Sequence, residues 1–191
     1  MSYHHFIGKL TRSEKVQAWI VNELLNSKLP LDKRESSVQW ELKHSSGVIQ
    51  IARILAQKRN VNEELAEIAA GLHDVYVIVE GGYTEHAQKG AVLARELLQN
   101  SGQFSNSEVV NICNAIANHS DKHIQSKDSF VELIKDADCF DCFLYGDSVY
   151  DYKPPEMLKH YYRRIISIRK EIGLAPKKYF EEGLQRLGGE S

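Results

Sequence analysis

The segment Ile68-Ala-Ala-Gly-Leu-His-Asp-Val75 places a histidine and an aspartate directly after a run of small and apolar residues. Upstream, Asn62 is a good helix N-cap, and an apolar stripe at helical spacing extends to Tyr76. This pattern predicts a largely buried helix over residues 63–79. A His-Asp pair on a buried helix is costly unless both groups are hydrogen-bonded or bind a metal ion.

The sequence on both sides of this segment repeats the helical pattern. Residues 31–153 contain no proline, and no long run alternates with the period of a β-strand. Residues 75–79 could form a short strand, but they continue an apolar helical pattern. We therefore expect an all-α protein, folded as a compact single-domain helical bundle. The predicted helices cover residues 12–28, 36–58, 63–79, 85–100, 108–119, 130–145, 155–172 and 176–187, the last ended by Gly188-Gly189.

Length and composition limit the classes of protein to consider. The chain has 191 residues, a net charge of −2 and a hydrophobic fraction of 42%. These values favour one domain over residues 1–191, with its motif region at about 36–145 and basic C-terminal helices at about 155–188. The charge argues against a nucleic-acid partner, and we find no membrane segment. Three Cys without a secretory leader favour the cytoplasm.

Several predicted helices carry a possible metal ligand along, or at the edge of, an apolar face. Because apolar faces converge on the core, these side chains could meet there. Imidazole and carboxylate groups brought together there would form a nitrogen and oxygen site, rather than a thiolate site, suited to Fe, Mn, Zn, Ni or Co. The alternative is that each histidine is only a hydrogen-bonded core residue. The candidates are His44, His73, Asp74, His86, His119 and Asp138.

The order of His44, His73-Asp74 and Asp138 resembles that of the HD-domain superfamily of metal-dependent phosphohydrolases. The resemblance spans roughly residues 40–145. It implies an all-α fold and a divalent metal ion held by His44, His73, Asp74 and Asp138. Asp136 competes with Asp138 for the distal position, and Ala137-Asp138 fits the family pattern better.

The resemblance also implies a second metal ion in some family members. His86 and His119 match the two additional histidine positions, and Asp74 would then bridge the two ions. Asp74 is also the expected catalytic residue, holding a water molecule and accepting its proton. We therefore expect one or two divalent ions per chain, drawn from Mn, Fe, Co, Ni, Zn and Mg.

Many related phosphohydrolases carry a phosphate-contacting lysine shortly after the His-Asp pair, and this chain has none there. Lys89, Lys122 and His123 are the candidates for contacting substrate phosphate, unless they are ordinary surface or loop residues. Residues 153–178 hold eight Lys or Arg against two Glu. This excess predicts either a solvated amphipathic helix or an electrostatic lip that attracts a phosphorylated substrate.

The favoured function is hydrolysis of a phosphate ester of a small metabolite, with nucleotides as the leading class. Two alternatives remain open: an HD-type di-iron oxygenase, and a non-catalytic module that binds a metal ion or nucleotide in signalling. A homodimer is possible. The Cys139-Phe-Asp-Cys142 motif is interpreted as packed helix residues, because the only other cysteine is Cys113 and a zinc site would need a second pair.

Overall fold

The computed structural model describes residues 8–188, and the all-α prediction is confirmed for this part of the chain, which contains no strand. Residues 1–7 and 189–191, including Gly189, lie outside it. The elements are α1 (Arg12–Leu25), the 3-10 helix η1 (Leu31–Lys33), α2 (Val38–Arg59), α3 (Glu63–Leu72), α4 (Val75–Glu80), α5 (His86–Ser101), α6 (Asn106–Asn118), α7 (Ser129–Tyr145), α8 (Pro155–Glu171) and α9 (Lys178–Arg186).

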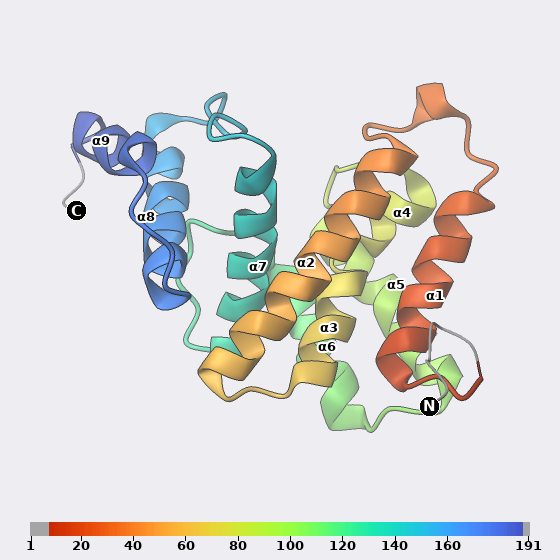
Figure 1. Cartoon of the computed structure of the whole chain (residues 1–191). Coiled ribbons are helices and arrows are strands. Elements are labelled where there is room, and N and C mark those ends of the chain that lie inside the picture. Colours follow the sequence, from red (N-terminus) through yellow and green to blue (C-terminus); the bar gives the residue numbers. More distant parts are fainter. Residues whose placement is uncertain (1–7, 189–191) are drawn as a thin grey trace.

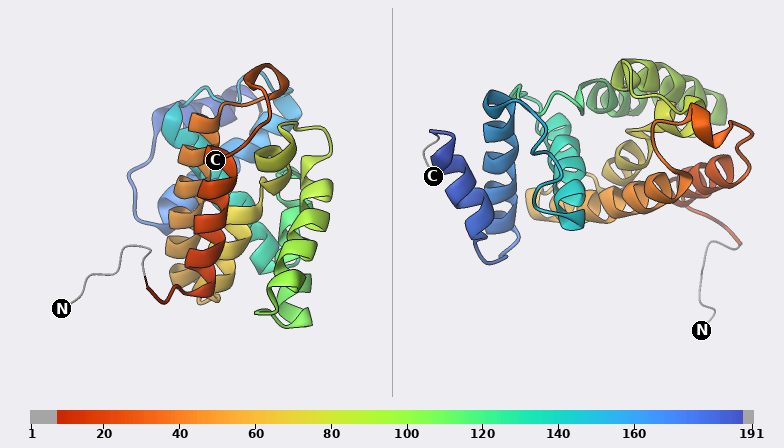
Figure 2. Two further views of the ribbon diagram at one scale, coloured as in Figure 1. Left: turned by 90° about the vertical axis from the view of Figure 1, so that its right-hand side faces the viewer. Right: turned by 90° about the horizontal axis from the view of Figure 1, so that it is seen from above.

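The helices pack in a row of neighbouring pairs. Helix α2 contacts both α3 and α7, α5 pairs with α6, and α8 pairs with α9. Helices α8 and α9 lie at one end of the molecule and α1 at the other, with α2 and α7 between them (Figure 1). The view from above shows α7, α8 and α9 side by side (Figure 2).

Helices α3 and α7 form the centre of the core. Every residue of α3 from Leu65 to Leu72 is buried, and so is most of α7. Helix α3 follows its expected cap, since the Asn62 side chain accepts a hydrogen bond from the Leu65 N–H at 3.0 Å. These two largely buried helices also position His73, directly after α3, and Asp138 on α7.

The predicted helix over residues 63–79 is wrong in one respect, because it breaks at His73-Asp74 into α3 and α4. Asp74 has φ −104° and ψ 25°, outside the helical region, and no side-chain hydrogen bond caps α4. Apolar residues lie on both sides of the break, so the apolar stripe gave no sign of it. The break leaves the Asp74 carboxylate available for other contacts.

Of the two C-terminal helices, α8 begins where it was predicted and α9 begins two residues later than predicted. Helix α8 begins at Pro155, a first-turn position where proline is well tolerated. Helix α9 begins at Lys178 rather than at Pro176. No described helix combines the length and the hydropathy needed to cross a lipid bilayer.

Candidate metal centre

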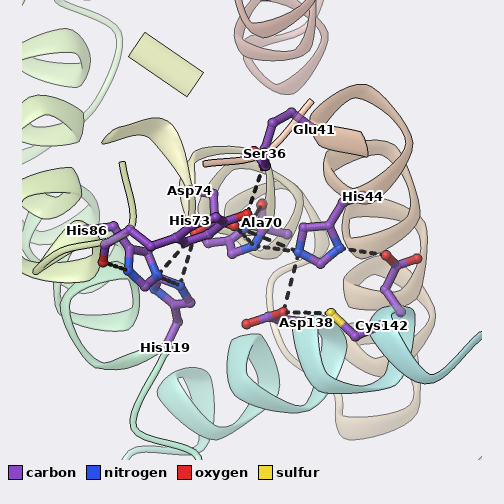
Figure 3. Close-up of polar contacts among 12 residues, drawn as sticks. Ser36, Glu41, His44, Ala70, His73, Asp74, His86, His119, Asp138 and Cys142 are labelled. Atoms are coloured by element: carbon purple, nitrogen blue, oxygen red, sulfur yellow. Dashed lines mark hydrogen bonds and ion pairs between the residues drawn. The ribbon is translucent and has the colours of Figure 1, made fainter. Parts of the chain in front are cut away.

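Five places in the fold bring the six candidate ligands together (Figure 3). His44 comes from the middle of α2 and Asp138 from α7. The other four lie at helix ends: His73 and Asp74 at the break between α3 and α4, His86 at the first residue of α5, and His119 just after α6. His86 is partly exposed and the other five are buried.

Three of the histidines are oriented by the same local device. The Nδ1 atoms of His73, His86 and His119 donate to the carbonyl three residues earlier, at 2.6, 2.8 and 2.7 Å. The backbone N–H of each histidine also lies near that carbonyl, as expected at a helix terminus. Because Nδ1 carries the proton, the Nε2 atom of each neutral ring keeps its lone pair and can serve as a ligand.

His44 is oriented by a carboxylate instead. Its Nδ1 donates to Asp141 Oδ2 at 2.7 Å, and Trp40 stacks on its ring at a centroid distance of 5.4 Å. Asp141 fits there because Gly47 has no side chain. A Cβ atom at Gly47 would lie 1.8 Å from Asp141 Oδ1. Gly47 therefore permits the contact between α2 and α7 that fixes His44.

The Asp74 carboxylate lies between two pairs of histidines. Its Oδ2 is 3.3 Å from His73 Nε2 and 3.8 Å from His44 Nε2. Its Oδ1 is 3.3 Å from both His86 Nε2 and His119 Nε2. One oxygen thus faces each pair, which is the arrangement expected of a carboxylate that bridges two cations.

Asp138, rather than Asp136, faces this cluster. Asp138 Oδ1 is 3.4 Å from His44 Nε2, and its Oδ2 forms a buried ion pair with Lys122. Asp136 instead forms ion pairs with Arg59 and Arg164, both at 2.7 Å. Asp138 is therefore part of the His and Asp cluster, whereas Asp136 belongs to a structural network of ion pairs.

The charges of the cluster stabilise one another. Burial opposes ionisation of Asp74 and Asp138, but neighbouring cationic groups hold the pKa of each carboxyl well below its usual value. Burial opposes protonation of His44, but hydrogen bonds to Asp138 and Asp141 raise its pKa to about 10. Burial lowers the pKa of His119, and Asp74 only partly offsets this effect.

The donor set fits a divalent metal ion. The Nε2 atoms of His44 and His73 lie 3.2 Å apart, and those of His86 and His119 lie 3.1 Å apart. Two lone pairs this close need a proton or a cation between them. Asp74 Oδ1 is buried and has no hydrogen-bond donor among the described residues. Overlapping groups drawn from these six side chains have ligand atoms close enough to share an ion.

The cluster lies at one side of a pocket of about 540 Å³, and Lys122 lines this pocket too. The other two candidates for phosphate contact lie elsewhere. Lys89 is 3.3 Å from Glu85 and lies over the Tyr76 ring. The exposed His123 lines a different pocket. The structure thus brings only Lys122 of the three beside the metal centre.

Several pocket residues were not identified from the sequence. The aromatic residues among them lie on separate segments and gave no local pattern, and Lys153 was seen only as part of the basic tail. Asp141 lies one helical turn beyond Asp138, a spacing that could have marked it as a neighbour. The missed pocket-lining residues are Trp40, Tyr83, Cys142, Tyr150, Tyr152, Lys153 and Tyr161.

Fold and site together define an all-α protein with a buried His and Asp cluster suited to divalent metal ions. The family model described as HD domain matches residues 42–142, which is more than half of the chain. The chain therefore belongs to the HD-domain superfamily of metal-dependent hydrolases. HD domains bind divalent metal ions.

A solved structure shows the same fold. It is the crystal structure of a predicted HD superfamily hydrolase from an uncultured Thermotogales bacterium, with 23% sequence identity and a TM-score of 0.51. The match covers 83% of this chain and 88% of the other. No curated protein matches the sequence.

We expect the substitution Gly47→Ala to weaken metal binding by roughly 10- to 100-fold, the usual effect of losing a ligand's hydrogen-bond partner. The added methyl group must displace the Asp141 carboxylate and so release His44 Nδ1. Metal titration followed by calorimetry measures the effect. Ser46→Ala, an exposed neighbour on the same helix, should leave the affinity unchanged.

The double variant Gly47→Ala/Asp141→Ala tests the cause. If Gly47 acts only through Asp141, the double variant binds metal no more weakly than Asp141→Ala alone. Additive losses would show that Gly47 has another role.

Metal affinity should rise with pH between about pH 7 and 9. In the metal-free protein the pKa of His44 is about 10, above its ordinary value, so its ring is protonated in this range. Its charged form stabilises the metal-free fold fully below about pH 6.5, and this contribution is lost as the pH rises through about 10. A metal ion must displace the proton on Nε2.

Each displaced proton should raise the apparent affinity about tenfold per pH unit. Calorimetric titration in two buffers with different ionisation enthalpies counts the released protons directly. A metal affinity that stays constant over this range, without proton release, contradicts the prediction.

Proposed function

We propose that this protein is a metal-dependent phosphohydrolase that hydrolyses a phosphate ester of a small metabolite, with nucleotides as the leading class. The observation that carries the proposal is the Asp74 carboxylate, which has one oxygen facing each histidine pair beside an open pocket. The resemblance to HD phosphohydrolases agrees with this reading.

The pocket has cationic groups suited to a phosphate. The Lys122 ammonium is buried and paired with Asp138, so its charge is held at the cluster. Lys153 has no carboxylate partner among the described residues. Its Nζ lies 5.1–5.4 Å from the ring centroids of Tyr150, Tyr152 and Tyr161. Burial, followed by the charge of Lys122, lowers the pKa of Lys153. An anion beside Lys153 would relieve this repulsion.

The pocket walls suit a flat apolar group next to that phosphate. Trp40 and Tyr83 line one part of the pocket, and the three tyrosines around Lys153 line another. Aromatic faces accept planar rings by stacking, and the serine hydroxyls of Ser36 and Ser120 offer hydrogen bonds. These features favour a nucleotide over a simple sugar phosphate.

Divalent ions held by the six side chains would acidify a bound water and offset the charge of the phosphate. Asp74 stays ionised at neutral pH because its pKa is held far below the usual value by nearby histidines that outweigh burial. It is therefore a weak base, and it accepts a proton only from a water that is already acidified. Lys122 and Lys153 would stabilise the additional negative charge on the phosphoryl oxygens.

The six-donor arrangement also fits the di-iron oxygenases of this superfamily, which is the second candidate. Two irons per chain together with O₂ consumption would favour it over the hydrolase. Stable ligand binding without turnover would instead indicate a binding module.

The deciding measurement is phosphate release from nucleotides, sugar phosphates and diesters with Mn²⁺, Co²⁺, Ni²⁺, Mg²⁺, Zn²⁺ and anaerobic Fe²⁺. We expect metal-dependent release that falls by at least about 100-fold in Asp74→Ala, since both metal bridging and proton transfer are lost. Asp32→Ala removes an exposed carboxylate on η1 and serves as the matched control.

Full activity in Asp74→Ala, or release that does not depend on metal, would rule out the proposed mechanism. Circular dichroism of both variants verifies that the helices remain folded.

The role of Lys153 in phosphate recognition can be tested with Lys89 as the matched control. We expect Lys153→Ala to raise KM about tenfold, because it removes a partly buried cation from the pocket. Lys153→Arg keeps the charge and should recover most of the loss. Lys89→Ala should change KM by less than about twofold, because Lys89 lies outside the pocket. Steady-state kinetics on the substrate found above tests all three, and equal effects of Lys89→Ala and Lys153→Ala would contradict the placement.

A further inference from the structure

A second pocket, of about 630 Å³, lies beside the metal centre. It is formed by the end of α2, by residues 122–129 with the start of α7, and by α8. Lys122 is the one residue that lines both pockets. Its ammonium group pairs with Asp138, whereas its carbonyl accepts a hydrogen bond from Arg164 Nε at 2.8 Å. Lys122 thus presents its ammonium to the metal centre and its backbone carbonyl to Arg164, which lines the second pocket.

Apart from Lys122, whose ammonium faces the metal centre, four Lys or Arg and only two carboxylates line the second pocket. The two carboxylates, Glu132 and Asp136, already have partners. Arg164 lies 2.7 Å from both, and Arg59 lies 2.7 Å from Asp136. These carboxylates are thus neutralised and would repel an entering anion only weakly.

Two cations of this pocket remain without a carboxylate. Arg163 on α8 and Lys127 on the loop between α6 and α7 are exposed, and neither forms an ion pair with any residue of the described chain. They come from elements far apart in the sequence but face one pocket. Two converging, uncompensated cations create a positive potential that favours anions.

Imidazole and hydroxyl groups complete the wall. The rings of His123 and His160 lie 6.5 Å apart between centroids, and the hydroxyls of Ser129 and Ser167 also line the pocket. Arginine, lysine, imidazole and hydroxyl groups together match a ligand with several oxygen acceptors, as a phosphate group provides.

We propose that this basic pocket is a second anion site, which binds a phosphate-bearing small molecule independently of the metal centre. Part of the basic tail thus has a different role from the electrostatic lip considered for the substrate. The inference rests on Lys127, Arg163 and their neighbours, so it stands whether or not the metal centre hydrolyses phosphate esters.

The test uses the full chain after chelator treatment and dialysis, so that no metal ion contributes to anion binding. Inorganic pyrophosphate is titrated by calorimetry, with inorganic phosphate in a second series. We expect saturable binding that includes one site per chain lined by Lys127 and Arg163. The double variant Lys127→Ala/Arg163→Ala should bind at least tenfold more weakly. Lys28→Ala/Lys178→Ala removes the same charge from exposed positions outside both pockets and should bind normally.

A further variant separates this site from the catalytic pocket. Lys153→Ala removes the phosphate contact proposed for the catalytic pocket, and it should still bind pyrophosphate at a site that depends on Lys127 and Arg163. The proposal is overturned if Lys153→Ala abolishes binding, or if both double variants lose affinity equally, because attraction would then reflect net charge alone. Displacement of pyrophosphate by a short single-stranded RNA at much lower concentration would also overturn it, by identifying the basic surface as a nucleic-acid contact.

Discussion

The arrangement of the centre depends on one carboxylate, that of Asp74, which gives each of its oxygens to a different pair of histidines. This position requires the chain to leave the helical conformation between α3 and α4. A continuous helix would have kept the side chain on the α3 surface, away from at least one pair. Residues 65–75, on both sides of the break, are all buried, so the packing of the surrounding helices holds the break in place.

Burying so many ionisable groups costs desolvation free energy, and hydrogen bonds and ion pairs to individual atoms of these groups offset that cost. His73 and His119 use backbone carbonyls at the C-terminal ends of α3 and α6, and His86 uses the Tyr83 carbonyl just before α5. His44 uses Asp141. Asp138 has Lys122. What remains is four histidine Nε2 atoms that face one another in pairs and one Asp74 oxygen without a donor in the described chain. A divalent cation satisfies these together, so the polar groups already present determine which ligand completes the centre.

The sequence carried much of the fold but only part of the site. The all-α class followed from helical spacing and the proline-free interior, because both report directly on backbone preference. The six cluster residues were predicted as metal ligands because their order along the chain resembles that of the HD-domain superfamily. The break at His73-Asp74 was missed because apolar residues continue through it. Lys89 and Lys153 show why the phosphate contact could not be predicted correctly. Both are single lysines near aromatic residues, and only the tertiary packing, which brings residues 146–154 to the pocket, distinguishes them.

The ligands are distributed along the chain from His44 to Asp138, with no two adjacent except His73 and Asp74. During synthesis the ribosome therefore releases the histidines well before Asp138, and the full set cannot assemble until most of α7 has emerged. Premature capture of a metal ion by an incomplete set would hold only a few ligands and would be weak. Tight metal binding would therefore follow the assembly of α2 to α7, whereas α8 and α9, which complete the core, are synthesised later.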